Sequence, residues 1–313
     1  MSSDISTLFC FGLGYSAGFL ARSLAAEGWR IAGTSRDDAA CARLAAEGFA
    51  MHRFERGRPV PREALAGATH LLASIPPDEA GDPILAEHAA DIAGLSHLRW
   101  AGYLSTTGVY GDRDGGWVDE TSELRPTGER GRRRVAAEAG WLDLYRRHNV
   151  PLHIFRLAGI YGPGRSALDT VRQGRAQRIE KPGHVFSRIH VEDIAQVLRA
   201  SIAKPNPGAV YNLCDDDPAP PEAVIAYACE LLGVPAPPLV PFEQAQLSPM
   251  ARSFYDDNKR VANRRIKEEL GVRLRYASYR EGLGAVLKGE SAGNPETPIS
   301  DCSGSASRPT SPR

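Results

Sequence analysis

The chain has 313 residues, of which 42% are hydrophobic and 24% are charged, a composition typical of globular proteins with a sizeable core. Its 38 basic residues balance 38 acidic ones, so net charge does not attract the protein to nucleic acid or to an anionic membrane. The longest apolar stretches, such as THLLASIPP at 69–77, are far shorter than the ~20 residues that cross a bilayer. The N-terminus MSSDISTL does not resemble a secretory leader, and we expect a cytoplasmic protein without a nucleic-acid or membrane partner.

Short apolar runs alternate with helical patterns through the first half of the chain. The run STLFCFG at 6–12 predicts a strand, and YSAGFLARSLAAEGW at 15–29 predicts a helix that ends near Gly28. The same alternation predicts strands at 30–35, 50–54, 69–75, 99–107 and 150–160, with helices at 37–48, 82–95 and 126–141. Strands separated by helices indicate an α/β fold with a Rossmann-type, doubly wound parallel sheet.

The alternation becomes less regular after residue 158, where proline-rich segments such as DDDPAPPEA at 215–223 appear. We therefore expect a Rossmann domain at 1–158 and a smaller, mixed substrate lobe at 159–288. The apolar run VYNLC at 210–214 predicts a buried strand that returns to the main sheet, so that the two parts interleave. Residues 289–313 contain almost no large apolar side chains and are predicted to be a disordered tail.

The segment GLGYSA at 12–17 has the form G-x-G-x-x-A and lies between the first predicted strand and the first predicted helix. There Gly12 permits a tight turn, Gly14 lets backbone amides approach a pyrophosphate, and Ala17 lets helix and strand pack closely. The helix N-terminus adds partial positive charge. A glycine turn that merely joins two elements is the alternative, but the long strand and helix series favours dinucleotide binding.

The end of the second predicted strand reads GTSR at 33–36, and in this fold that position meets the adenosine ribose of the cofactor. Ser35 offers a hydroxyl, and the guanidinium of Arg36 can bind a 2′-phosphate through two N–H groups. Asp37 and Asp38 follow, where they also suit the first turn of a helix. This segment favours NADP over NAD, so the 1–158 domain is expected to bind NADP.

Three further motifs stand in order along the chain, namely STTGVYGD at 105–112, RLAGIYGPG at 156–164 and SRIHVEDIA at 187–195. With the glycine turn, they make the chain resemble the extended short-chain dehydrogenase/reductase superfamily, which includes the NAD-dependent epimerases and dehydratases. The resemblance covers about residues 6–287. The segment KRVANRRIKEELGVRLRYASYREGL at 259–283 is similar to the C-terminal part of atypical members.

This resemblance implies a set of cofactor and substrate contacts. In such enzymes a Ser or Thr four residues before the tyrosine of VYG binds the substrate oxygen, and that residue here is Thr106. Relatives often pair through the helices beside the arginine-rich segment, so the resemblance allows a homodimer. The implied cofactor contacts are Gly12, Gly14, Tyr15, Ala17, Ser35, Arg36, Ser74, Ile75, Pro76, Ser105, Arg134, Ala158 and Gly159.

The catalytic YxxxK pair of the superfamily is absent from the helix that should carry it. When VAAE at 135–138 is set on the family's alanine-rich stretch, Arg134 takes the place of the lysine and Arg130 that of the tyrosine. Arg134 keeps the positive charge and is predicted to act in the site. Arg130 cannot exchange a proton near neutral pH. Both can bind an anionic substrate group, whereas solvation of a helix surface is the preferred interpretation for Arg132 and Arg133.

Tyr110 is the ionisable hydroxyl nearest to Thr106 in the sequence and is our candidate for the missing acid/base. A nearby arginine would lower its pKa, and packing with a bonded hydroxyl is the alternative that we favour. The only YxxxK match, Tyr255 to Lys259, lies in the substrate lobe and is interpreted as a chance match. His190 begins a predicted helix, for which a capping role is preferred.

Two functions agree with these patterns. The first is an NADP-dependent oxidoreductase or epimerase-like enzyme that acts by hydride transfer on a small polar substrate. The second is a non-catalytic NADP(H)-binding sensor or scaffold, which the missing tyrosine favours. No His, Cys, Asp or Glu residues have metal-ligand spacing, and the five cysteines include no CxxC pair, so we expect no metal.

Overall fold

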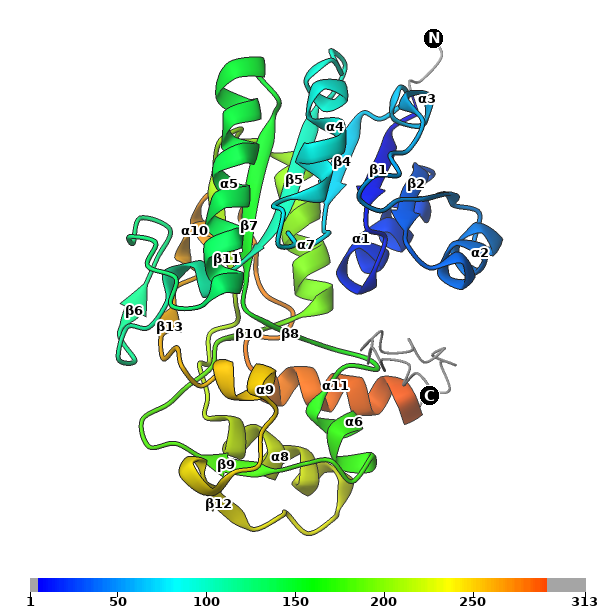
Figure 1. The fold of residues 1–313 in the computed structure, drawn as a ribbon. Coiled ribbons are helices and arrows are strands. Elements are labelled where there is room, and N and C mark those ends of the chain that lie inside the picture. The colour runs from blue at the N-terminus through cyan, green and yellow to red at the C-terminus, as the bar shows by residue number, and fades with distance from the viewer. Residues whose placement is uncertain (1–4, 292–313) are drawn as a thin grey trace, which may run out of the picture.

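The computed structural model of the chain describes residues 5–291 and is built around one seven-stranded sheet (Figure 1). The strand order is β11-β7-β5-β4-β1-β2-β3, and all neighbouring strands are parallel. This order confirms the doubly wound Rossmann fold, with the reversal of strand order between β1 and β4. The strands are β1 Thr7–Phe11, β2 Arg30–Ser35, β3 Ala50–Arg53, β4 His70–Ala73, β5 Trp100–Thr106, β7 Leu152–Leu157 and β11 Val210–Leu213.

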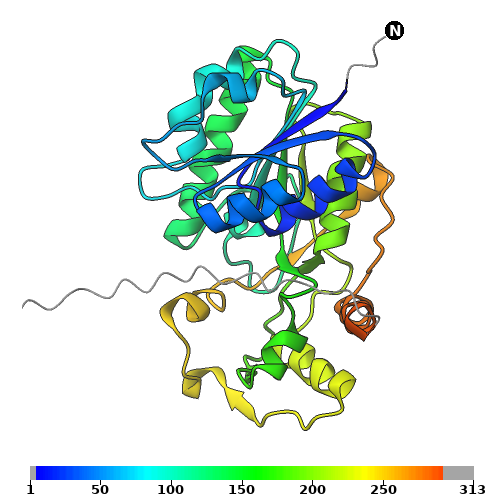
Figure 2. The same cartoon turned by 90° about the vertical axis from the view of Figure 1, so that its right-hand side faces the viewer.

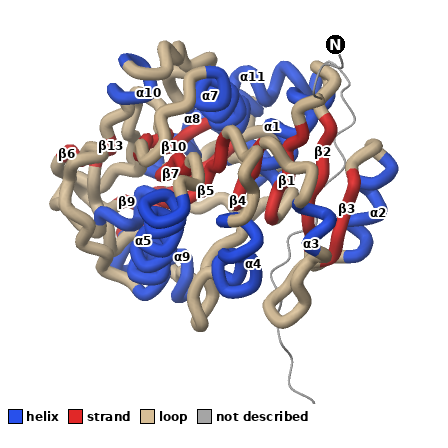
Figure 3. Tube along the Cα trace, turned by 90° about the horizontal axis from the view of Figure 1, so that it is seen from above, coloured by secondary structure: helices blue, strands red, loops and turns tan. Residues whose placement is uncertain are grey.

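Helices cover both faces of the sheet, as Figures 2 and 3 show. A parallel sheet covered on both faces needs strands that are apolar throughout, which explains the continuous apolar runs in the sequence. One face packs against α1 Tyr15–Ala25, α2 Asp38–Ala46 and α7 Val191–Ala203, and the other against α3 Arg62–Leu65, α4 Pro83–Ala93 and α5 Glu129–His148. The fully buried rings of Trp100 and Trp141 lie on opposite faces.

The single strand predicted at 150–160 is wrong, because the chain leaves the sheet after Leu157. Strand β8, Gly159–Tyr161, pairs instead with β10, Arg188–His190, in a separate two-stranded sheet. The amide of Ala158 makes the last bond to β11, and the amide of Gly159 already donates to the carbonyl of Ser187. A continuous apolar run does not reveal this change of partner, since β7 is buried and two of the three residues of β8 are buried or half-buried.

A small lobe lies at the carboxyl ends of the strands (Figure 1). Between its segments the chain returns to the sheet as α7 and β11, and the run VYNLC pairs with β7. Helix α11 extends to Ser291, past the predicted start of the tail. The rest of that predicted tail, 292–313 with Cys302, lies outside the described residues. The lobe contains α6 Ala167–Arg172, β9 Arg178–Glu180, α8 Pro221–Leu232, β12 Leu239–Pro241, α9 Pro249–Ser253 and α11 Tyr279–Ser291.

Short elements lie within this lobe or between it and the edge of the sheet. They are η1 Thr107–Tyr110, β6 Trp117–Val118, η2 Phe242–Gln244, β13 Arg260–Val261 and α10 Arg264–Glu268. Strand β13 pairs with β6, so residues near 260 lie beside the loop that precedes α5. Between residues 5 and 291, no helix has both the length and the apolar character needed to span a bilayer.

Candidate functional site: the carboxyl edge of the sheet

The glycine turn joins β1 to α1 and is held by β2. The amide of Gly12 donates to the Thr34 hydroxyl at 2.8 Å, and the amide of Leu13 donates to the Thr34 carbonyl at 2.8 Å. Gly14 is the N-cap of α1 and provides no side chain to cap it. The first amides of α1 therefore point out of the helix with partial positive charge, an arrangement suited to an anion.

Gly12 and Gly14 meet different constraints. Gly12 has φ +82°, and a Cβ there would lie 2.7 Å from Cγ1 of Ile75, so the fold itself requires glycine at this position. Gly14 is exposed, and a Cβ there would meet only the Gly12 carbonyl oxygen at 4.0 Å. Protein packing therefore does not require glycine at position 14. The open surface at Gly14 fits the close approach of a pyrophosphate.

The neighbouring predicted cofactor residues surround this turn. Ala17 is 1% exposed and packs in the core under α1. Tyr15 donates from its hydroxyl to the Pro163 carbonyl at 2.9 Å, which ties the start of α1 to the loop after β8. The guanidinium of Arg165 lies 5.7 Å from the centre of the Tyr15 ring. Sequence reasoning missed Arg165, which adds a positive charge next to the turn.

The residues after β4 support the turn from its other side. The amide of Ser74 donates to the Phe11 carbonyl at 2.9 Å, and its hydroxyl donates to the Gly12 carbonyl. Ile75 fills the space beside Gly12. Pro76 is exposed. These three predicted contacts therefore lie next to the turn, and their contact with a cofactor stays a prediction.

At the end of β2 the two acidic residues have hydrogen-bond or ion-pair partners, whereas the arginine has none among the described residues. Asp37 caps α2 by accepting from the amides of Ala39 and Ala40, and Asp38 forms an ion pair of 2.5 Å with Arg53. Ser35 accepts from the Asp37 amide. Within residues 5–291, Arg36 is exposed and has no hydrogen bond or ion pair. Its guanidinium is therefore available for an external anion.

Ser105, at the end of β5, belongs to a buried polar network. Its hydroxyl donates to the Glu138 carboxylate at 2.5 Å, so this side chain is not presented to a ligand. Glu138 also accepts from Arg156 in two hydrogen bonds of 3.1 and 2.8 Å. The sequence did not predict this ion pair. The only indication was that Glu138 of α5 and Arg156 of β7 are charged residues among apolar neighbours. Thr106, next in the chain, is half-buried, and its hydroxyl accepts from the Gly108 amide at 3.1 Å.

Tyr110 is fully buried in the same network. Its hydroxyl donates to the Asn212 side-chain oxygen at 2.7 Å and accepts from Arg156 at 2.9 Å. Burial raises the pKa of Tyr110 to about 12, because it outweighs the effect of Arg156, which acts to lower this pKa as expected. The packing alternative therefore holds, and Tyr110 is not suited to act as an acid/base near neutral pH.

The arginines that replace the YxxxK pair differ in their surroundings. Arg134 donates to the Leu104 carbonyl at 2.7 Å and to the Tyr103 hydroxyl at 3.0 Å, so its guanidinium is anchored on β5. Arg130 is exposed and lies 5.7 Å from the centre of the Phe254 ring. Neither arginine supplies the acid/base hydroxyl that the tyrosine of the YxxxK pair provides. The neighbouring Arg132 forms a surface ion pair with a glutamate of its own helix, as expected.

The other sequence candidates have structural roles in this arrangement. Tyr255 and Lys259 do not form a pair, because the Lys259 ammonium donates to Asp257 at 3.1 Å. His190 caps α7 by accepting from the Glu192 amide at 3.3 Å. Burial lowers the pKa of His190 to about 4. It is therefore neutral at physiological pH and cannot serve there as a cationic acid.

Ala158 and Gly159 stand where β7 ends and β8 begins. Ala158 is 7% exposed, whereas Gly159 is exposed to solvent. A Cβ at Gly159 would lie 3.7 Å from Cγ of Arg188 on β10. This places Gly159, a predicted cofactor contact, directly beside Arg188, a residue of the motif SRIHVEDIA for which the sequence predicted no role.

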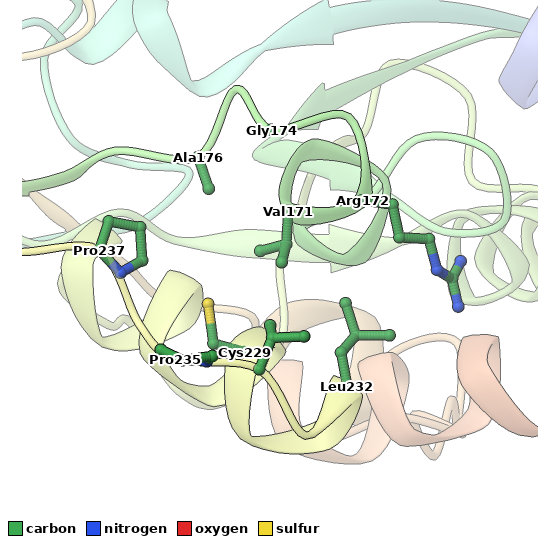
Figure 4. Close-up of a pocket in the computed structure, with 9 residues that line it drawn as sticks. Val171, Arg172, Gly174, Ala176, Cys229, Leu232, Pro235 and Pro237 are labelled. Atoms are coloured by element: carbon green, nitrogen blue, oxygen red, sulfur yellow. The ribbon is translucent and has the colours of Figure 1, made fainter.

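The small lobe holds a separate surface cavity of about 550 Å³ between α6 and the end of α8 (Figure 4). Its lining is mainly apolar and includes none of the residues described above. The residues that line it are Val171, Arg172, Gly174, Ala176, Cys229, Leu232, Val234, Pro235 and Pro237. The cavity is therefore distinct from the carboxyl edge of the sheet.

Comparisons with known proteins bear on this arrangement. Protein YeeZ of Escherichia coli strain K12 is 30% identical over 285 residues, which are 85% of this chain and 94% of YeeZ. UDP-glucuronic acid 4-epimerase of Bacillus cereus, solved with UDP-glucuronic acid and NAD, is 14% identical, has a TM-score of 0.71, and aligns over 91% of this chain and 99% of its own. The chain therefore belongs to the same family as Protein YeeZ, and it has the fold of the NAD-dependent epimerases and dehydratases that the sequence resemblance implied.

Among solved structures, a conserved protein of unknown function from Silicibacter pomeroyi is 57% identical, with a TM-score of 0.84 over 91% of this chain and 99% of that one. No protein-family model matches the chain. NAD-dependent epimerases and dehydratases of known structure share the fold of this chain. At 14% identity, the likeness to the epimerase shows the fold and not the substrate.

Proposed function

We propose that this protein is an NADP-dependent oxidoreductase or epimerase-like enzyme that acts by hydride transfer on a small polar substrate. The observation that carries this proposal is the open surface at Gly14, beside the uncapped N-terminus of α1. Glycine there has no role in protein packing, and a pyrophosphate that contacts the backbone amides explains it.

The preference for NADP rests on the end of β2. A 2′-hydroxyl of NAD would need a free carboxylate there, but Asp37 and Asp38 are engaged with α2 and with Arg53. Arg36 is exposed and has no partner within residues 5–291. A guanidinium without a carboxylate partner favours the additional phosphate of NADP.

Bound NADP would supply a carbon centre that accepts or releases hydride. Thr106, which is half-buried at the end of β5, would orient the oxygen of the substrate carbon that reacts. Arg134, anchored on β5, would keep a positive charge beside the cofactor ribose. The proton then comes from a group other than Tyr110, since that hydroxyl is fixed in the core.

A non-catalytic NADP(H)-binding sensor is the second candidate. The observation that favours it is the anchoring of Arg134 on Tyr103 and Leu104, with Arg130 stacked on Phe254, where the superfamily places its acid/base pair. A protein of this kind binds the oxidised and reduced cofactors with different affinity and turns over no substrate.

Titration calorimetry with NADP, NADPH, NAD and NADH tests the proposal. We expect NADP to bind at least about tenfold more tightly than NAD, because the 2′-phosphate gains a charge-assisted hydrogen bond. Arg36→Asp should remove this preference. Arg43→Gln is the control, because it changes an exposed arginine of the neighbouring helix α2, and it should leave the preference intact. Equal or tighter binding of NAD to the wild-type protein would contradict the NADP assignment. A substrate screen at the absorbance of reduced nicotinamide then separates enzyme from sensor.

A further inference from the structure

Most of the buried polar side-chain atoms without a hydrogen-bond partner belong to residues 178–222. Among the described residues there are seven such side-chain atoms, and only Nε of Arg53 lies outside 178–222. Leaving a buried polar atom unpaired costs free energy, so a group of them indicates a missing partner. The other six atoms are Nε of Arg178, Nδ1 and Nε2 of His184, Nε2 of His190, Oδ2 of Asp215 and Oε2 of Glu222.

Arg188 of β10 lies in the same segment of the chain. One terminal nitrogen, Nη1, donates to the carbonyls of Phe186 and Ala219, each at 2.9 Å, which fixes the guanidinium between β10 and the small lobe. Within residues 5–291 the remaining guanidinium nitrogens have no acceptor, and no carboxylate forms an ion pair with Arg188. Its Cγ would lie 3.7 Å from a Cβ at Gly159, an exposed residue that is a predicted cofactor contact.

Two carboxyl groups share the surroundings of Arg188. Asp215 is 1% exposed and follows β11, and its amide donates to the Arg188 carbonyl at 2.6 Å. Glu222 lies in the first turn of α8. Burial raises the pKa of Asp215 to about 8 and raises the pKa of Glu222 above its ordinary value, and the charge of Arg188 opposes both shifts. The three groups therefore interact electrostatically without forming an ion pair.

Aromatic rings close this region on the side of the small lobe. The ring of His184 is 2% exposed and stacks on Tyr255, with centroids 5.3 Å apart and an angle of 25° between the planes. Phe186 packs edge-on against Tyr255, with centroids 5.5 Å apart. In the described part of the chain the Tyr255 hydroxyl has no partner, although the ring is only 8% exposed. This hydroxyl and the His184 nitrogens add polar atoms that can bind a hydroxylated ligand.

We propose that Arg188 binds the carboxylate of a small hydroxycarboxylate or oxocarboxylate, with Asp215 and Glu222 as partners for its hydroxyl groups. This assignment rests on the proposed function, because it makes the ligand the substrate that meets the nicotinamide beside Gly159. A carboxylate fits better than a phosphate for two reasons. Only the Nε and Nη2 donors of Arg188 are without an acceptor within residues 5–291, and the two nearby carboxyl groups would repel a second negative charge. A single positive charge in such surroundings matches a monoanion rather than a dianion.

Titration calorimetry of the full chain, with and without saturating NADP, tests the assignment. The probes are glycerate, which has a carboxylate and hydroxyls, propionate, which has the carboxylate alone, glycerol, which has hydroxyls alone, and inorganic phosphate. We expect glycerate to bind most tightly. Arg188→Gln should weaken glycerate binding by roughly tenfold or more, since a charge-assisted hydrogen bond is lost. Arg188→Lys should retain part of the affinity because it keeps the charge.

Controls separate a lost contact from a lost fold. Thermal unfolding should show that Arg188→Gln is folded at the titration temperature, and its NADP affinity should equal that of the wild-type protein. Arg264→Gln, which removes an arginine with a 79% exposed side chain on α10, should bind glycerate like the wild type. If Arg188→Gln is unfolded, the comparison of Arg188→Lys with the wild type carries the test, and equal glycerate affinity there overturns the assignment.

Failure of this assignment is distinguishable from failure of the proposed function. Equal glycerate binding by wild type and Arg188→Gln, tightest binding of phosphate, or no glycerate binding with and without NADP would each overturn the role of Arg188, whether or not NADP binds. If instead no dinucleotide binds but glycerate binding depends on Arg188, the carboxylate site stands and the proposed oxidoreductase function falls.

Discussion

The buried ion pair between Glu138 and Arg156 is the interaction whose loss we expect to reduce stability most. Glu138 is 2% exposed and Arg156 is 5% exposed. Glu138→Ala leaves the Arg156 guanidinium charged in the core without a carboxylate partner. Removing one member of a buried pair costs about 3–5 kcal/mol, a large share of the roughly 5–15 kcal/mol that keeps a typical domain folded. The acceptor of Ser105 disappears in the same variant, and this loss is not additive with the first.

Urea unfolding followed by circular dichroism measures this cost as a lower midpoint at an unchanged slope. Asp143→Ala is the control, because it removes an exposed ion pair with Arg147. The side chain of Asp143 is 46% exposed and that of Arg147 is 73% exposed. That pair contributes less than ~1 kcal/mol. Replacing Glu138 and Arg156 together by leucine should recover most of the loss, since no unpaired charge remains. Equal losses for Glu138→Ala and Asp143→Ala would refute the reasoning.

The turn glycines and Asp215 support two further predictions. Gly12→Ala should lower the free energy of unfolding by about 1–3 kcal/mol, because Gly12 has a left-handed φ. Gly14→Ala should leave thermal unfolding unchanged but weaken NADP binding at least about tenfold, as measured by calorimetry. Equal destabilisation by the two substitutions would contradict this prediction. The pKa of Asp215 is raised from 3.8 to about 8, so its contribution to stability is complete below pH 3.8 and is lost as the pH rises through about 8. Urea unfolding across this range should show the wild type losing ~1.4 kcal/mol per pH unit relative to Asp215→Asn, and a pH-independent difference would disprove the shift.

Local patterns in the sequence predicted the sheet and the glycine turn. Strands buried on both faces are continuous apolar runs, and helices show their own period and caps, so each element is encoded within a few residues of itself. The pattern of the turn at 12–17 is equally local, because all of its residues lie within six positions between β1 and the first turn of α1. The capping role of His190 and the first-turn position of Asp38 follow from the same short-range rules.

Only the tertiary structure decided which polar groups meet. Tyr110 and Asn212 are 102 positions apart in the chain and form a hydrogen bond. Because of this contact, Tyr110 is a packed core residue and not the acid/base that the sequence made a candidate. The change of partner after Leu157 brings Arg188 beside Gly159, a proximity that no periodic pattern records. Apolar periodicity reports how strongly a residue is buried, but a hydrogen bond or ion pair depends on which distant segment folds against it, and this is set by the packing of the whole chain.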